Sequence, residues 1–158
     1  QSALSLVSPK IATPSSEWKT YTIAGLSYQL PQDVLAPICD GATCASLGTY
    51  LPGGTRFTVA THNNARLFSD VAVIVDSAGR EFTTTETTVV GRRAFSYQGL
   101  FTGTTTGGYS FSQMRGVMIL QNDTQTLEMN HFTPTGVSAD FASDDQVFDQ
   151  ILQTLVLP

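Results

Sequence analysis

Positive charge is scarce in this sequence, and that scarcity limits the partners the protein can bind. Of the 158 residues, eight are Lys or Arg and 13 are Asp or Glu, which gives a net charge of −5. Arg92 and Arg93 form the one adjacent basic pair. Because proteins bind nucleic acids through clusters of Lys and Arg that neutralise phosphates, the sequence excludes nucleic acid as a partner.

Long apolar runs are also missing. A helix needs about 18 or more consecutive apolar residues to cross a bilayer, and no stretch of the chain is that long. We therefore expect no transmembrane segment. The first residues lack the charged and apolar regions of a signal peptide, so we expect that any export signal has been removed. A lipid anchor upstream of Gln1 stays open.

Cysteine is limited to Cys39 and Cys44, which four residues separate. This spacing is too wide for a redox Cys-x-x-Cys motif, and no second Cys or His pair completes a zinc site. We predict a disulfide between the two, with two buried thiols or a metal as the alternatives. A disulfide implies an oxidising compartment, so we expect an extracytoplasmic protein, either periplasmic or secreted.

The domain organisation is simple. Residues 1–17 are rich in Ser, Pro and Ala without a sustained period, which predicts a flexible tether. The remaining residues, 18–158, carry enough apolar material for one core. We expect a single domain there.

Alternating apolar and polar residues predict an antiparallel meander in the second half of the chain. The alternating segments are 81–90, 92–102, 109–120 and 125–133. Apolar residues spaced by three and four predict helices near 65–78 and 144–155. We therefore expect an α+β fold, in which an antiparallel β-sheet of five to seven strands is flanked by helices as an α/β/α-type sandwich.

The start of the terminal helix carries a capping signature. Ser143 and Gln146 have the spacing of a capping box, and we expect Asp144, Asp145 and Asp149 to face solvent and to stabilise the helix dipole.

The order of hairpin, helix, meander and terminal helix resembles the PsbP-like family, which includes the extrinsic subunit of photosystem II and many small exported bacterial lipoproteins. The segments that carry the resemblance are 21–31, 90–94 and 148–152. It covers residues 18–158. The resemblance implies an antiparallel sheet flanked by helices, in a protein that binds or assists others without turning over a substrate.

Catalytic patterns are not recognisable. No Gly-x-Ser-x-Gly motif occurs, and the only histidines are His62 and His131, so a serine hydrolase has little support. Arg93 and Arg115 lie near aromatic residues and could form an anion pocket, although ion pairs with neighbouring Glu residues explain them equally well.

A soft-metal site is the sharpest alternative. If Asn122 and Asp123 form the hairpin turn, then opposite residues sum to 245, and Met114 faces His131. The candidate copper ligands are therefore Met114, Met118, Met129 and His131, because thioether and imidazole groups suit copper(I). Core packing by methionine is the competing interpretation.

We predict a noncatalytic exported binding or accessory module, in the periplasm or at the cell surface, that needs no cofactor and binds another envelope protein. The alternatives are a copper-binding protein and a small hydrolase with an unrecognised site.

Overall fold

Strands dominate the fold, which was obtained as a computed structural model. The structure describes residues 17–23, 25–32, 34, 48–62, 73–75, 81–100, 111–122, 125–134 and 136–157. The elements are β1 (Lys19–Ile23), β2 (Leu26–Leu30), β3 (Gly48–Tyr50), β4 (Arg56–His62), β5 (Val73–Val75), β6 (Glu81–Val89), β7 (Arg92–Leu100), β8 (Phe111–Leu120), β9 (Thr126–Pro134) and α1 (Phe141–Gln153).

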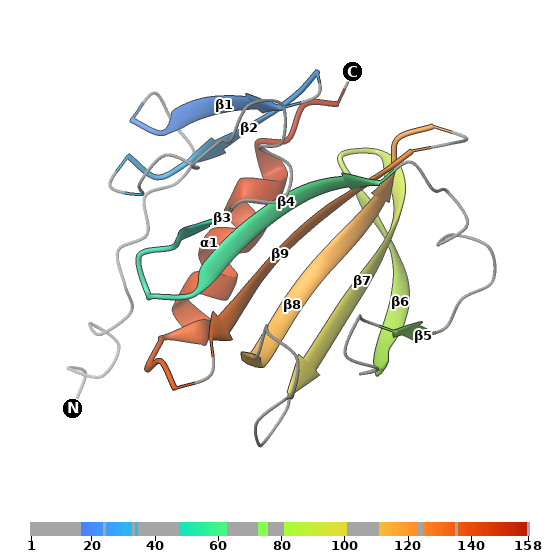
Figure 1. The fold of residues 1–158 in the computed structure, drawn as a ribbon. Helices are drawn as coiled ribbons and strands as arrows, with labels where there is room; N and C mark the ends of the chain where they lie inside the picture. The colour runs from blue at the N-terminus through green and yellow to red at the C-terminus, as the bar shows by residue number, and fades with distance from the viewer. Residues whose placement is uncertain are drawn as a thin grey trace, which may run out of the picture.

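Seven strands form one antiparallel sheet in the order β3-β4-β9-β8-β7-β6-β5, and β1 pairs with β2 separately (Figure 1). The antiparallel sheet is therefore confirmed, with the meander β6 to β9 at its centre. Val90 and Gly91 join β6 to β7 with φ angles of 44° and 80°. Two consecutive positive φ angles are typical of the tight turns whose twist matches that of a hairpin.

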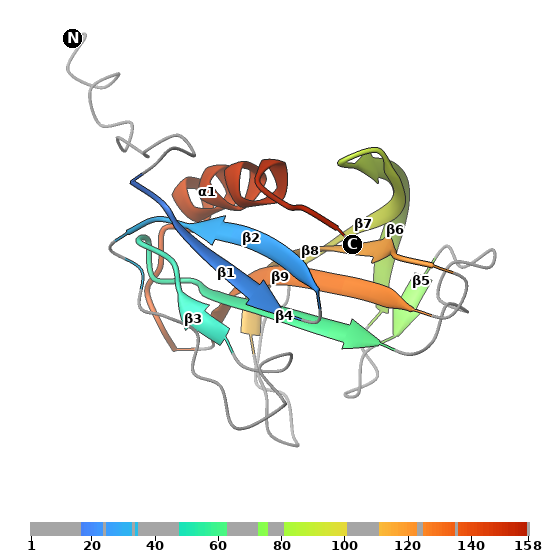
Figure 2. The ribbon, with the colours of Figure 1, turned by 90° about the horizontal axis from the view of Figure 1, so that it is seen from above.

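Helix α1 packs on one face of the sheet, against β9 and β2. Its apolar stripe of Val147, Phe148 and Ile151 is buried among Phe57 and Met129 from the sheet. Figures 1 and 2 show α1 and the β1–β2 hairpin over the part of the sheet formed by β3, β4 and β9, while β6 and β7 extend beyond the helix. One half of this face is therefore packed, and the other half has no described helix over it.

The opposite face of the sheet carries a second buried cluster. It consists of Phe95, Tyr97, Met118 and Phe132. The Tyr97 hydroxyl donates a hydrogen bond to Glu128. Burial and the nearby Glu128 carboxylate raise the pKa of Tyr97 well above its ordinary value. Buried apolar side chains therefore lie on both faces of the sheet.

The predicted α+β sandwich with two flanking helices is wrong, because the chain is mostly β and α1 is the only helix in the described residues. Within the predicted helix 65–78, Val73–Val75 form strand β5, and the rest of that range lies outside the described residues. The physical reason is the run Val71-Ala72-Val73-Ile74-Val75. Its β-branched side chains favour a strand although their spacing also fits a helix.

The terminal helix begins at Phe141, three residues before the predicted start. Its N-cap is Asp140, whose carboxylate accepts a hydrogen bond from the Ser143 backbone at 3.1 Å. The predicted capping box at Ser143 is therefore wrong. Asp144 lies in the first turn of the helix and is fully buried.

Residues 1–16 of the predicted tether 1–17 lie outside the described residues, and so does the predicted Cys39–Cys44 disulfide. Both stay predictions. No described helix is long and apolar enough to cross a membrane.

Candidate functional site

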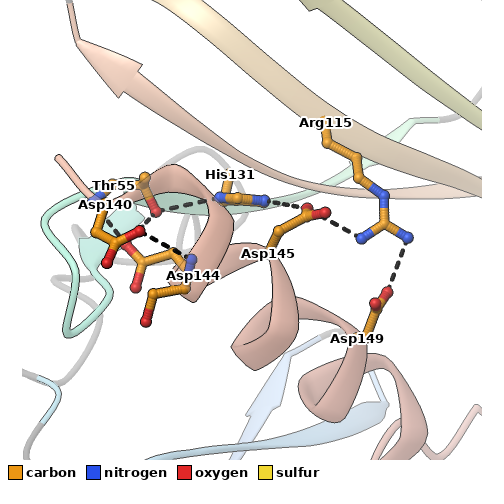
Figure 3. Close-up of polar contacts among 8 residues, drawn as sticks. Thr55, Arg115, His131, Asp140, Asp144, Asp145 and Asp149 are labelled. Carbon is orange, nitrogen blue, oxygen red and sulfur yellow. Dashed lines mark hydrogen bonds and ion pairs between the residues drawn. The ribbon is translucent and has the colours of Figure 1, made fainter. Parts of the chain in front are cut away.

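His131 is fully buried between the sheet and α1. It lies on β9 opposite Arg115 of β8. Its ring stacks on Phe141, with 4.3 Å between the ring centroids, and its two nitrogens point to different partners. Nδ1 lies 3.2 Å from the Thr55 hydroxyl and Nε2 lies 2.7 Å from the Asp145 carboxylate (Figure 3).

Asp144 ties the first turn of α1 to the turn before β4. Its carboxylate accepts hydrogen bonds from Gly53 N at 2.7 Å, Thr55 N at 2.9 Å and the Thr55 hydroxyl at 2.7 Å. A Cβ atom at Gly53 would come within 2.7 Å of the Asp144 carboxylate. This close approach requires glycine. Three donors satisfy a carboxylate that is shielded from water.

These contacts fix the orientation of the His131 ring. The Thr55 hydroxyl has one hydrogen, which it donates to Asp144, so it can only accept from His131 Nδ1. The Asp145 carboxylate lies on the other side of the ring, 2.7 Å from His131 Nε2. His131 is therefore held between the Thr55 hydroxyl and the Asp145 carboxylate.

Arg115 continues the chain of charges toward the surface. It donates to Asp145 at 3.0 Å and lies 2.8 Å from Asp149, and its guanidinium lies over the Phe148 ring. Burial raises the pKa of Asp145, but hydrogen bonds from His131 and Arg115 outweigh this and hold it below its ordinary value. Burial lowers the pKa of Arg115, but hydrogen bonds to Asp149 and Asp145 raise it overall.

Thr55, His131 and Asp145 together have the residue types of a hydrolase triad. Both Thr55 and His131 are fully buried, and the Thr55 hydroxyl is already committed to Asp144. A nucleophile must reach a bound substrate, and this hydroxyl cannot. The cluster is therefore a structural support that fastens α1 to the sheet.

An open groove lies beside α1, over β6, β7 and β8. It consists of three hollows of about 320, 420 and 330 Å³. The first and second share Ser96 and Arg115, and the second and third share Gln98, so the three are continuous. The floor includes Thr85 of β6, and one end is closed by Phe141. The helix wall is formed by Asp149, Leu152 and Gln153.

The sheet does not bring the candidate copper ligands together. Opposite residues on β8 and β9 sum to 246 along most of the hairpin, so Met114 pairs with Phe132 and Met118 with Glu128. This one-residue shift from the predicted register places Met114 and Met118 on one face and Met129 and His131 on the other. Among the described residues, no group of three His, Cys, Asp or Glu side chains is arranged to hold a metal ion.

The predicted anion pocket is also divided between the two faces. Arg93 pairs with Thr88 and Arg115 with Gln98, and these alternate positions point to opposite sides of the sheet. Arg93 forms an exposed ion pair with Glu86 at 3.1 Å.

The other histidine, His62, is the last residue of β4 and pairs with Thr126 of β9.

The sequence analysis did not predict the groove, and it did not predict that Asp144 and Asp145 belong to the buried cluster. Asp144 and Asp145 were expected to face solvent, yet they bind Thr55 and His131. A signal was present, because His131 is in phase with Leu127 and Met129 on β9. A histidine on a buried face needs polar partners.

Comparisons with known proteins add the fold and nothing more. No protein-family model and no curated protein matches the chain. A crystal structure from Bacteroides thetaiotaomicron is similar, with a TM-score of 0.53 and 13% sequence identity. The match covers 90% of this chain and 49% of that one, so this chain spans about half the length of that protein. The resemblance to the PsbP-like family stays a prediction.

Proposed function

We propose that the protein is a noncatalytic binding module and that its binding surface is the groove between α1 and strands β6 to β8. The observation that carries this proposal is a contrast within one face of the sheet. The reactive residue types, Thr55 and His131, are sealed in the core, whereas the hydrogen-bonding side chains of the groove are open to solvent. A ligand can reach the second set and not the first.

The groove is well supported for binding. Its floor is a sheet whose opposite face is packed by Phe95, Tyr97, Met118 and Phe132. Its wall is α1, which the Asp144 and Asp145 contacts fasten to the sheet. Rigid elements reduce the ordering cost that a ligand must overcome on binding.

An exported location is part of the proposal and rests on Cys39 and Cys44. The resemblance to the PsbP-like family also supports a noncatalytic role. Copper binding is not proposed, because the sheet separates the methionines by face.

Site-specific photo-crosslinking tests the proposal. A benzophenone amino acid at Gln98 places the probe in the groove, and the same probe at Gln146 places it on an exposed part of α1 outside the three hollows. In an envelope fraction of the source cells, we expect the Gln98 probe to capture a ligand that the Gln146 probe does not. Equal labelling at both positions would contradict the groove as the binding surface.

A further inference from the structure

We infer that the groove binds a neutral, hydroxyl-rich chain, namely an uncharged oligosaccharide. This inference rests on the proposed function and specifies the ligand class of the same site. Four properties of the groove lead to it: the chemistry of its side chains, its charge, its apolar content and its shape.

Uncharged hydrogen-bonding side chains are the most numerous kind in the groove, beside apolar side chains such as Val89, Val117 and Leu152 in the first hollow. The amides of Gln98, Gln113 and Gln153 and the hydroxyls of Thr85 and Thr87 line it. Within the described part of the chain, none of these five side chains makes a hydrogen bond. Each amide offers donors and an acceptor side by side. Neighbouring hydroxyls of a sugar ring, which both donate and accept, complement such groups.

The two charged side chains that line the groove, Arg115 and Asp149, form an ion pair with each other. Arg115 lies 2.8 Å from Asp149 and 3.0 Å from Asp145, so its guanidinium is committed to two carboxylates. An anionic ligand would have to displace them and would meet their negative charge. A cationic ligand would meet Arg115. A neutral ligand avoids both costs.

The apolar content argues against a protein ligand. Protein interfaces depend on buried aromatic or apolar anchors, yet the exposed large apolar side chains among the described residues lie on four separate segments. They are Tyr50, Val90, Val137 and Val156, and of these Val90 alone lines the groove. The groove floor is also a sheet face, so it offers no free backbone groups for strand addition. Phe141 at one end provides a ring against which the apolar face of a sugar can pack.

The shape favours a linear ligand. Each hollow is at the lower end of the range of about 300–1,000 Å³ for ligand pockets, and shared residues join the three in a row. Repeating units of an oligosaccharide can occupy successive hollows. A single compact ligand would fill one and leave the others empty.

Isothermal titration calorimetry with soluble hexasaccharides tests the inference. The probes are cellohexaose, maltohexaose, laminarihexaose and chitohexaose, with polygalacturonate and poly-glutamate as charged comparisons. We expect at least one neutral hexasaccharide to bind and both polyanions to fail. The variant Thr85→Trp, which fills the floor, should weaken binding at least tenfold.

The matched control is Glu86→Trp, the next residue on β6, which is also exposed and points to the opposite face. It should bind the hexasaccharide as the unmodified protein does. An equal loss in both variants, or tighter binding of a polyanion, would overturn the inference.

The outcomes also separate this inference from the proposed function. If no hexasaccharide binds and the Gln98 probe captures a protein, the ligand class is wrong and the groove remains the binding surface. If no hexasaccharide binds and the Gln98 and Gln146 probes label alike, both are wrong.

Discussion

The Nε2 atom of His131 lies 2.7 Å from Oδ1 of Asp145, and this contact joins strand β9 of the sheet to the N-terminal part of α1. The same carboxylate oxygen accepts from Arg115, whose other nitrogen reaches Asp149. Asp149 belongs to the wall of the groove. The buried cluster therefore sets the position of the helix against which a ligand would lie.

Removal of the Thr55 hydroxyl should destabilise the fold. Thr55→Val keeps the shape and removes one donor to the buried Asp144 carboxylate and one acceptor for His131. We expect the free energy of unfolding to fall by about 1–3 kcal/mol, since a buried charged group loses a partner. Thr55→Ser keeps the hydroxyl and should lose less. Urea denaturation measures both, and an equal loss in the two variants would contradict the role of the hydroxyl.

The free energy of unfolding should decrease in acid through Asp145. Its pKa in the folded state lies below the ordinary value of 3.8, chiefly because hydrogen bonds from His131 and Arg115 outweigh burial. The stabilisation is thus complete above about pH 4–5 and is lost as the pH falls through the folded pKa. In Asp145→Asn, thermal denaturation between pH 2 and 6 should show a shallower acid decrease. Asp149→Asn, at a more exposed carboxylate, is the control and should keep most of the slope.

Gly116 should not tolerate a side chain. It pairs with Tyr97, and a Cβ atom at this position would overlap the ring carbon Cζ and the hydroxyl of Tyr97. Gly116→Ala should cost about 1–3 kcal/mol through overpacking. In a Tyr97→Ala background the same substitution should cost much less. A full cost in both backgrounds, measured by urea denaturation, would show that the tyrosine is not the obstacle.

Patterns of period two predicted the antiparallel meander, because Phe95 and Tyr97 alternate with the polar residues Ser96 and Gln98 as the pleat requires. The helix at 65–78 failed because the spacing of Val71, Ile74 and Val75 fits a helix and their β-branched side chains fit a strand. Propensity outweighed periodicity there.

Which residues come together in the candidate copper site and in the buried cluster depends on the pairing register of distant strands, and local sequence patterns specify that register poorly. A hairpin sum of 246 in place of 245 exchanged the face of every side chain on β8 relative to His131. Arg115 came opposite His131 and Met114 did not. The contacts of Asp144 with Gly53 and Thr55 join residues about 90 positions apart, and no single segment records them.

Cys39 and Cys44 test the exported location. If the chain resides in an oxidising compartment, the two thiols should be joined. Protein purified from its source with iodoacetamide present and without reductant should gain no alkyl groups, as measured by intact mass. After reduction it should gain two. Two alkyl groups without reductant would remove the argument for export.

The position of a bound ligand tests the central claim most directly. We propose an NMR titration of the ¹⁵N-labelled protein with the hexasaccharide that binds best in calorimetry. The account predicts that the largest amide shifts occur at Thr85, Ser96 and Gln98, on the floor of the groove. Shifts centred on Thr55 and His131, or on the opposite face of the sheet, would contradict it.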